Sequence, residues 1–261
     1  MSLLTEFPRI GLIGFGAFGQ LIARHLSSFV PILVHDPALT CDRPQHPSLR
    51  PATLAETAAC PLVILAVPVN AMETLCRDIA PLLIPGTLVV DVGSVKVAPA
   101  RVMLRTLPKK VDLLGTHPLF GPESTQDGLA GRKIALCPLR GHRPLRLAAF
   151  LRRALQLDVI WTTPEEHDRE LATVQGLTHL IAQALSQVTP ERLRMTTASF
   201  DLMQQASQMV IGDSRSVLEA ILRDNPFAAE VRTDFLRCAS DLSQSPSWSK
   251  PQKNPPIVAG F

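Results

Sequence analysis

Short apolar runs alternate with amphipathic segments from residue 9 to about residue 162, and this alternation restricts the fold more than any other feature of the sequence. Strands that are apolar on both sides belong to parallel sheets that helices cover on both faces. Segments 17–28 and 70–80 carry apolar residues at helical spacing. The sequence therefore predicts an α/β fold with a doubly wound parallel sheet. We expect its strands at residues 9–14, 32–35, 62–67, 87–92, 111–116, 133–137 and 159–161.

Helical signals replace the strand pattern after Trp161. Thr163 and Glu166 have the spacing of a capping box, and Pro164 occupies the first helical position between them. The long helix that starts here is apolar over much of its circumference, so we expect it to be buried within this chain or against a second subunit. Further helical segments are expected near residues 191–210, 214–224 and 226–242.

These patterns divide the 261 residues into three parts. Residues 1–162 are expected to form the α/β domain and residues 163–242 an all-helical domain. Residues 243–261 are rich in Pro and Ser, and we expect them to be disordered. The connection at 37–51 is rich in Pro, Asp and His and is expected to lie at the surface.

The charge pattern argues against a nucleic-acid partner, and the length of the apolar runs argues against a membrane partner. The chain has 26 Lys and Arg against 23 Asp and Glu, with basic residues in runs of at most two. Nucleic-acid surfaces usually cluster their basic residues, so a nucleic-acid partner is not expected. The most apolar run, 61–69, is far shorter than the ~20 residues of a membrane-spanning helix, so no membrane partner is expected.

The cysteines and the N-terminus indicate a cytoplasmic protein. Glu6 interrupts the apolar start, so we expect no secretory signal. The number of cysteines is odd and no Cys-x-x-Cys pair occurs, which favours free thiols over a disulfide framework. None of the His, Cys and carboxylate residues has the spacing of a metal site, and we expect no metal. The five cysteines are Cys41, Cys60, Cys76, Cys137 and Cys238.

A glycine motif follows the first predicted strand and opens the first predicted helix. In this Rossmann context, Gly14 would permit a tight turn, Gly16 would let a pyrophosphate approach, and Gly19 would let the helix pack on the strand. The N–H groups at the start of the helix would bind phosphate oxygens. The predicted dinucleotide-binding loop consists of Gly14, Phe15, Gly16, Ala17, Phe18 and Gly19.

Asp36 lies 22 residues after Gly14, at the end of the second predicted strand. A carboxylate there accepts hydrogen bonds from the adenine ribose and repels a 2′-phosphate, which favours NAD over NADP. The nearest arginine that follows is Arg43. Val67 and Pro68 close the third predicted strand and are expected to line the nucleotide cleft.

Ser94 and His117 follow two further predicted strands. Ligands of open α/β sheets bind outside the carboxyl ends of the strands, so both side chains are expected to face the cleft where a nicotinamide would lie. A histidine in a loop with two Gly and two Pro is a better candidate for chemistry than an isolated histidine elsewhere.

The sequence resembles the prephenate and arogenate dehydrogenases of tyrosine biosynthesis. The resemblance is carried by Asp-Val-Gly-Ser-Val-Lys at 91–96, His-Pro-Leu-Phe-Gly-Pro-Glu-Ser at 117–124, Glu-Glu-His-Asp at 165–168 and Thr-His at 178–179. It runs from residue 9 to about 230. It implies that the helical half is a dimerisation domain, that the enzyme is a homodimer, and that the active site lies between the two domains. It also implies the monofunctional form, without a mutase or a regulatory domain.

The resemblance assigns roles to several residues. His117 would act as the base that removes the hydroxyl proton of the substrate while hydride passes to NAD, and Ser94 would bind the same hydroxyl. His179 would face the substrate with Gln175 one turn before it, and His167 would link the domains rather than act in catalysis.

An arginine would bind a substrate carboxylate. Its position depends on how this stretch is aligned with the family: a gapless comparison gives Gly212, and a small shift gives Arg215, which we choose. Arg223 and Arg232 are the other candidates, although we expect their side chains to be solvated.

Asp127 bears on which acid is used. Arogenate carries an ammonium where prephenate carries a keto group, and an ammonium in a partly dry pocket requires an acceptor. The loop after His117 contains Glu123 and Asp127, and Asp127 stands beside Gly128, where the loop can bend. The loop is also more similar to that of arogenate-using members. We therefore expect arogenate to be preferred, although Asp127 and Gly128 could equally form an ordinary turn.

Two other interpretations compete. β-Hydroxyacid dehydrogenases also join a Rossmann half to a helical half, but they carry a catalytic lysine on the first interdomain helix. This chain has no lysine between Lys133 and Lys250. A non-catalytic NAD-binding module would explain the glycine loop but not the pairing of Ser94 with His117. NADH formation with prephenate or arogenate separates all three.

Overall fold

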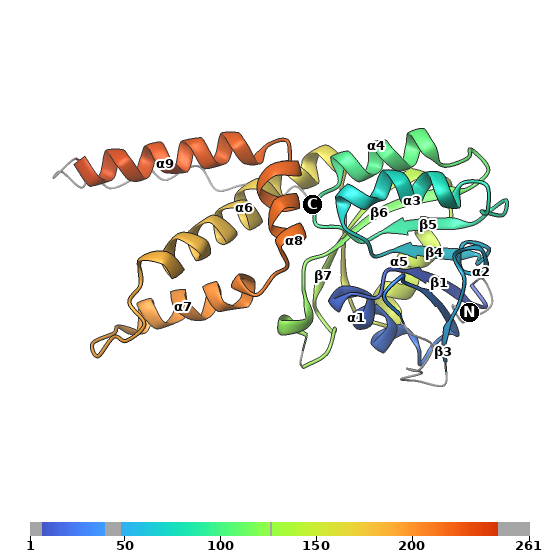
Figure 1. Ribbon diagram of the computed structural model, residues 1–261, viewed down its shortest axis with the longest axis horizontal. Helices are drawn as coiled ribbons and strands as arrows, with labels where there is room; N and C mark the ends of the chain where they lie inside the picture. Colours follow the sequence, from blue (N-terminus) through green and yellow to red (C-terminus); the bar gives the residue numbers. More distant parts are fainter. Residues whose placement is uncertain (1–6, 40–47, 126, 245–261) are drawn as a thin grey trace.

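The computed structural model describes residues 7–39, 48–125 and 127–244, and eight of its strands form one sheet (Figure 1). The strand order is β3-β2-β1-β4-β5-β6-β7-β8. Neighbouring strands are parallel except β6 and β7. The predicted doubly wound, Rossmann-type α/β fold is confirmed. The strands are β1 (Ile10–Ile13), β2 (Ile32–His35), β3 (Leu49–Pro51), β4 (Leu62–Leu65), β5 (Leu88–Asp91), β6 (Asp112–Pro118), β7 (Lys133–Arg140) and β8 (Asp158–Trp161).

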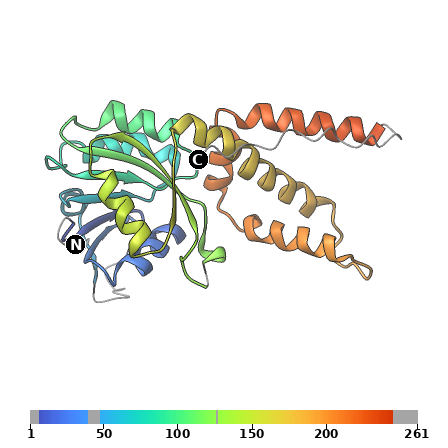
Figure 2. The same cartoon turned by 180° about the vertical axis from the view of Figure 1, so that it is seen from behind.

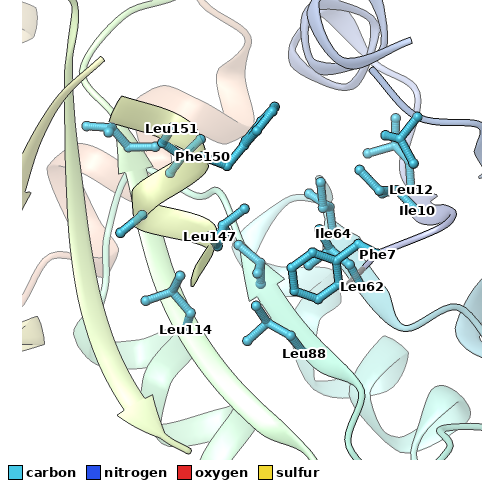
Figure 3. Packing of buried hydrophobic residues seen from close by; sticks show 14 of the residues in the cluster. Phe7, Ile10, Leu12, Leu62, Ile64, Leu88, Leu114, Leu147, Phe150 and Leu151 are labelled. Atoms are coloured by element: carbon cyan, nitrogen blue, oxygen red, sulfur yellow. The ribbon is translucent and has the colours of Figure 1, made fainter. Parts of the chain in front are cut away.

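Helices cover both faces of the sheet, which explains its continuously apolar strands. Because side chains alternate along a strand, Leu62 and Ile64 enter one core while Val63 and Leu65 enter the other. Helices α1 (Ala17–Leu26) and α5 (Pro144–Arg153) complete the first core, which Figure 3 shows around Leu147. The second core is completed by α2 (Leu54–Ala58), α3 (Met72–Ile79), which follows the short η2 (Val69–Ala71), and α4 (Val97–Thr106).

Two features of the sheet differ from the sequence prediction. Strand β3 lies within the segment that was expected to be a surface connection, and it pairs with β2 through Leu49 and Ile32. It is a three-residue edge strand that ends in Pro51, so it has too little alternation to be recognised. Strand β7 runs antiparallel to β6 because the chain reverses through a loop, residues 119–132, that contains η3 (Pro122–Ser124) and has no crossover α-helix among its described residues.

The capping box predicted at the start of the helical half is confirmed. The Thr163 side chain accepts a hydrogen bond from the backbone N–H of Glu166, whose carboxylate accepts one from the N–H of Thr163. The predicted helix at 214–224 is divided into a short α-helix and a π-helical turn. The elements are α6 (Pro164–Val188), α7 (Ala198–Ile211), α8 (Arg215–Glu219), η4 (Ala220–Asp224) and α9 (Ala228–Gln244).

The helical half projects from the sheet as an arm (Figures 1 and 2). Helix α6 begins beside β6 and runs outward, and α7 and α9 pack along it. Apolar side chains of this arm remain exposed, so the long helix is not fully buried within the chain. They include Val174, Val188, Leu202, Met209 and Leu236.

Helix α9 extends beyond the predicted end of the helical domain, and the described cysteines are free thiols as expected. Ser243 and Gln244, which were assigned to the disordered tail, belong to α9, while residues 245–261 and Cys41 lie outside the described part. Cys60, Cys76 and Cys137 are buried free thiols, and Cys238 is a free thiol at the surface. None of the helices formed by residues 7–39, 48–125 and 127–244 is both long and apolar enough to cross a bilayer.

Candidate active site

The glycine loop has the backbone geometry that its motif requires. Gly14 has a φ of 97°, and a Cβ there would overlap the Ala66 carbonyl oxygen at the end of β4. A Cβ on Gly19 would overlap the Gly14 carbonyl oxygen, so this glycine lets α1 approach the loop. At Gly16, by contrast, no described atom lies within 4 Å of the Cβ position. Protein atoms therefore occupy the Cβ positions of Gly14 and Gly19, whereas the Cβ position of Gly16 is open.

The start of α1 fits a dinucleotide phosphate. Gly16 provides no side-chain cap, and the first turn of the helix has no acidic residue. The first N–H groups of a helix have no partners within it, and they carry the positive end of the helix dipole. The open space at Gly16 and these N–H groups are what a pyrophosphate needs. The residues present thus fit a nicotinamide dinucleotide.

Asp36 is held against the same loop. Its Oδ2 accepts a hydrogen bond of 2.6 Å from the N–H of Phe15, and its Oδ1 accepts one of 2.8 Å from the N–H of Ala38. A carboxylate has about four acceptor positions, so two remain for ribose hydroxyls. Val67 borders the loop, with its Cγ1 3.2 Å from the Cβ position of Gly14, and Pro68 precedes η2.

Ser94 and His117 leave neighbouring strands at one edge of the sheet, as the sequence predicts. Asp91 of β5 is in register with Gly115 of β6, so the residues that follow these two lie close together. His117 is still within β6, because β7 continues to pair with it through Ala135. The Ser94 side chain is half-buried and makes no hydrogen bond to another described residue.

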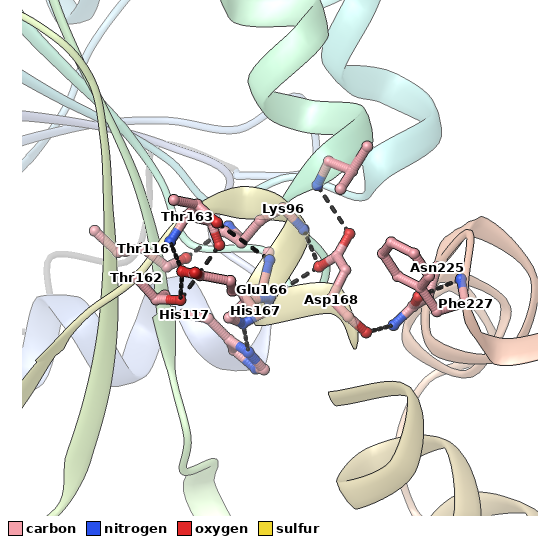
Figure 4. Close-up of polar contacts among 12 residues, drawn as sticks. Lys96, Thr116, His117, Thr162, Thr163, Glu166, His167, Asp168, Asn225 and Phe227 are labelled. Carbon is pink, nitrogen blue, oxygen red and sulfur yellow. Dashed lines mark hydrogen bonds and ion pairs between the residues drawn. The ribbon is translucent and has the colours of Figure 1, made fainter. Parts of the chain in front are cut away.

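His117 belongs to a buried chain of hydrogen bonds that joins the two halves of the protein (Figure 4). Its Nδ1 lies 2.8 Å from Nε2 of His167, and Nδ1 of His167 lies 2.8 Å from Oδ1 of Asp168. The three residues are only 3%, 3% and 0% exposed. His167 therefore contacts the expected base directly, in addition to linking the domains.

Asp168 is fixed by backbone groups on both sides. Its Oδ1 and Oδ2 accept hydrogen bonds of 2.7 and 2.8 Å from the N–H groups of Lys96 and Val97, at the start of α4. Its carbonyl oxygen accepts one of 2.8 Å from the side chain of Asn225. One aspartate of α6 thus caps α4 and holds the turn that precedes α9.

A buried ion pair lies behind His117. Nζ of Lys96 is 2.5 Å from Oδ1 of Asp91 and donates a hydrogen bond of 2.6 Å to the Thr116 carbonyl oxygen. Burial raises the pKa of Asp91, although Lys96 opposes this effect. Burial, with His167 and Lys96 nearby, holds the pKa of His117 well below its ordinary value. The imidazole of His117 is consequently kept neutral, as a proton acceptor must be.

His179 and Gln175 lie farther along α6 than His167. Nε2 of His179 is 3.0 Å from Oδ2 of Asp213, and its Nδ1 is 2.9 Å from the Gln175 carbonyl oxygen. Oε1 of Gln175 is buried without a hydrogen-bond partner among the described residues. His179 therefore ties α6 to the turn before α8 and is three helical turns away from the His117 cluster.

The arginine candidates differ in their surroundings. Arg215 is the first residue of α8; its side chain is 88% exposed and pairs with Glu219 at 2.8 Å. Arg223 instead lines a cavity of about 170 Å³ between the two halves of the chain, together with Asn70 and Ser216. The side chain of Arg232 donates a hydrogen bond to the Leu222 carbonyl oxygen.

The predicted loop carboxylates lie at the surface. Asp127 is exposed in a turn that is closed by a hydrogen bond from the N–H of Gly128 to the Thr125 carbonyl oxygen, and Gly128 has a φ of 103°. Glu123 is exposed in η3. Among the described residues, no group of three or more His, Cys, Asp and Glu side chains is arranged to hold a metal ion.

Sequence reasoning missed four residues of the buried cluster, namely Asp91, Lys96, Asp168 and Asn225. Lys96 and Asp168 are part of the quoted signatures, but nothing in their local pattern indicates burial. Asn225 lies in an Asn-Pro pair between two helical segments, which is a turn signal rather than a functional one.

Comparisons with known proteins agree with this architecture. The family model described as the prephenate dehydrogenase nucleotide-binding domain matches residues 49–159, and the one for the prephenate dehydrogenase dimerization domain matches residues 163–245. The chain belongs to the prephenate dehydrogenase family. The glycine loop and Asp36 precede the first matched segment, so their assignment depends on the geometry given above.

Two curated relatives and one solved structure illustrate the similarity. A probable arogenate/prephenate dehydrogenase of Methanocaldococcus jannaschii is 28% identical over 194 residues, 70% of this chain and 43% of the relative. The chloroplastic arogenate dehydrogenase 2 of Arabidopsis thaliana is 27% identical over 234 residues, 85% of this chain and 65% of the relative. The chain therefore spans less than two thirds of either protein.

The solved structure shares the fold. Prephenate dehydrogenase from A. aeolicus, in complex with hydroxyphenyl propionate and NAD⁺, superposes with a TM-score of 0.70 at 21% identity. The superposition covers 90% of this chain and 89% of the other.

Proposed function

We propose that this family member catalyses the NAD-dependent oxidative decarboxylation of arogenate, prephenate or both. The observation that carries the proposal is the buried His117 at the carboxyl edge of the sheet, the same edge that carries a glycine loop that fits a dinucleotide. NAD, when bound, supplies the acceptor for the hydride that leaves C4 of the substrate ring.

His117 performs the proton transfer in this proposal. Nε2 of His117 takes the proton from the ring hydroxyl at C4, with the Ser94 hydroxyl holding the same oxygen, and the O–H electron pair completes a C=O bond as the hydride departs. The ring carboxylate then leaves as CO₂, and its electron pair restores aromaticity. The carbonyl oxygen becomes a phenol by recovering a proton. A base placed in this way contributes roughly 10²- to 10⁴-fold.

Substrate-dependent NADH formation by the purified protein tests the activity. We expect reduction of NAD with at least one of the two acids, faster than reduction of NADP. Asp36→Ser should narrow the difference between the cofactors, because it removes the carboxylate that repels a 2′-phosphate. Equal kcat/KM for NAD and NADP in the wild type contradicts the cofactor assignment. A lack of turnover with both acids contradicts the function.

Arogenate is the substrate that we propose to be preferred, with Asp127 as the acceptor for its ammonium group. Asp127→Asn should lower kcat/KM for arogenate and leave that for prephenate nearly unchanged. Glu123→Gln is the matched control, because Glu123 is an exposed carboxylate of the same loop. If Asp127→Asn does not change the ratio of the two kcat/KM values, Asp127 is a turn residue only.

Arg215 remains our proposed ligand for a substrate carboxylate. Arg223, which lines the interdomain cavity together with Glu219 and Asp224, is the alternative. Arg215 would have to leave Glu219 in order to bind substrate. Single substitutions to Gln decide between them: the variant that raises KM by about tenfold or more identifies the ligand, since one charge-assisted hydrogen bond contributes about 1.5–3 kcal/mol. The exposed Arg237 provides the control substitution.

The active assembly is proposed to be a homodimer formed through the helical domain, residues 163–242. The exposed apolar side chains of α6, α7 and α9 support this proposal, because a monomer in water would leave them uncovered. His179 and Gln175 are proposed to contact the substrate from this domain.

A further inference from the structure

We infer that His167 and Asp168 are positioning residues that fix His117 in the tautomer whose Nε2 is free to accept a proton. The inference rests on the proposed function, since it concerns how the proposed base is kept ready. It goes further in assigning a role to two residues that do not touch the substrate.

The hydrogen bonds of Asp168 decide which nitrogen donates and which accepts along the series Asp168, His167 and His117. A carboxylate is an acceptor only, and Asp168 accepts from the N–H of Lys96, from the N–H of Val97 and from His167. Nδ1 of His167 must therefore carry the proton and donate it. In a neutral His167 this is the one N–H of the ring, so Nε2 is left as an acceptor. A doubly protonated His167 would instead donate from Nε2 and reverse the bond to His117, and the ¹⁵N spectrum described below distinguishes the two states.

The acceptor role of His167 Nε2 in turn fixes which nitrogen of His117 carries the proton. Its Nδ1 lies 2.8 Å from the accepting Nε2 of His167, so Nδ1 of His117 must be the donor. In a neutral His117 the remaining nitrogen, Nε2, has no proton. This is the nitrogen that the proposed reaction needs for the hydroxyl proton, and the opposite tautomer would present an N–H to the substrate instead.

Burial makes this arrangement stable. All three side chains are shielded from water, so no solvent molecule can replace a lost partner cheaply. Asp168 is in turn held by backbone groups of α4 and by Asn225, which restrains its rotation. When His117 gains a proton, the Asp168 carboxylate stabilises the positive charge through His167, without itself taking the proton.

The substitution Asp168→Asn tests the inference. Oδ1 of Asp168 accepts from both the Lys96 N–H and His167, whereas Oδ2 accepts only from the Val97 N–H, so the amide oxygen should take the place of Oδ1 and the bond from His167 should be kept. The variant loses the negative charge that stabilises protonated His117, together with the bond from Val97. We expect kcat to fall by about tenfold or more, with KM changed by no more than a few-fold.

Asp112→Asn is the matched control. Oδ2 of Asp112 accepts hydrogen bonds from the N–H groups of His142 and Arg143 before α5, so it also caps a helix from another element, but it contacts no imidazole. Both variants should lose a similar amount of thermal stability, and only Asp168→Asn should lose kcat. Equal loss of kcat in both variants would reduce Asp168 to a structural cap and overturn the inference.

Two substitutions at His167 test whether an amide can replace the hydrogen bonds of the imidazole. His167→Gln retains an amide oxygen that can accept from His117 and an N–H₂ group that can donate to Asp168, whereas His167→Phe retains only the ring volume. The Gln variant should keep at least tenfold more kcat than the Phe variant. Equal kcat in the two variants overturns the inference.

The tautomer can also be observed without any turnover. In the ¹⁵N-histidine-labelled full chain, Nε2 of His117 should resonate as an unprotonated nitrogen in the wild type and should shift toward the protonated position in His167→Phe, where Nδ1 of His117 has lost its acceptor. A protonated Nε2 in the wild type overturns the inference. Because this measurement needs no substrate, it separates failure of the inference from failure of the proposed function.

Discussion

Helix α6 buries polar side chains at its start and leaves apolar side chains exposed toward its far end. At its start, polar His167 and Asp168 are almost completely shielded by the α/β half. Toward its far end, and on the adjoining α7, the apolar Val188 and Leu202 are 75% and 66% exposed. Each end reverses the usual rule that apolar residues lie inside and polar residues outside.

The comparison indicates that the start of α6 belongs to the candidate active site and that its far end belongs to an interface. Buried polar groups are costly unless they are fully hydrogen-bonded, so a satisfied buried network indicates a site whose geometry matters. Exposed apolar groups are costly unless another surface covers them, so the far end indicates an interface.

The largest effect is expected at the base itself. His117→Asn should lower kcat by at least ~10²-fold and leave NAD affinity nearly unchanged, because the imidazole acts in the transition state. Steady-state kinetics and NAD titration measure the two quantities. His142→Asn, at an exposed histidine, should retain full activity. Normal turnover in His117→Asn would remove this residue from the mechanism.

Loss of the cation behind His117 should destabilise the fold. Lys96→Met leaves Asp91 as a buried unpaired charge, and the free energy of unfolding should fall by about 3–5 kcal/mol. The double variant with Asp91→Asn should recover part of this loss. Arg50→Met breaks an exposed pair with Glu56 and should cost at most about 1 kcal/mol. Denaturant unfolding compares the three proteins, and equal losses in Lys96→Met and Arg50→Met would contradict the prediction.

At the far end, a charge should weaken self-association. Leu202→Glu places a carboxylate on the exposed apolar face of α7 and should raise the dimer dissociation constant by about tenfold or more. Leu145→Glu is the control, since Leu145 is 64% exposed on α5 in the other half of the chain. Sedimentation equilibrium measures both variants. A monomeric wild type at micromolar concentration defeats the dimer proposal altogether.

The smallest effect concerns stability at acid pH. The pKa of His117 is lowered in the folded protein, whereas the unfolded chain binds a proton at about the ordinary value of 6.5. The unfolded state therefore binds more protons below that pH, and the wild type should lose up to about 1.4 kcal/mol of stability per pH unit as the pH falls from 6.5 toward the folded pKa. His117→Asn should show a flatter dependence. If the free energy of unfolding depends on pH equally in the wild type and in His117→Asn, then His117 has the same pKa in the folded and unfolded states, and the prediction is wrong.

Most of the sheet could be predicted from the sequence because its strands are apolar on both sides and are separated by helical periods. The glycine loop, Asp36 and the edge of the sheet that carries Ser94 and His117 followed from the same pattern. Strand β3 and the antiparallel direction of β7 could not be predicted, because a three-residue edge strand has no period and a strand's direction depends on its neighbour.

Most of the order of elements, and the glycine loop that we expect to bind a dinucleotide, follow from the sequence, and the expected base follows from its resemblance to the family. The groups that surround this base could be identified from the tertiary structure alone. Lys96, His117 and Asp168 are far apart along the chain, and local periodicity carries no information about contacts over 50 or 70 residues. Such contacts arise when the first turn of α6 packs against the carboxyl edge of the sheet, where most buried polar groups pair with one another.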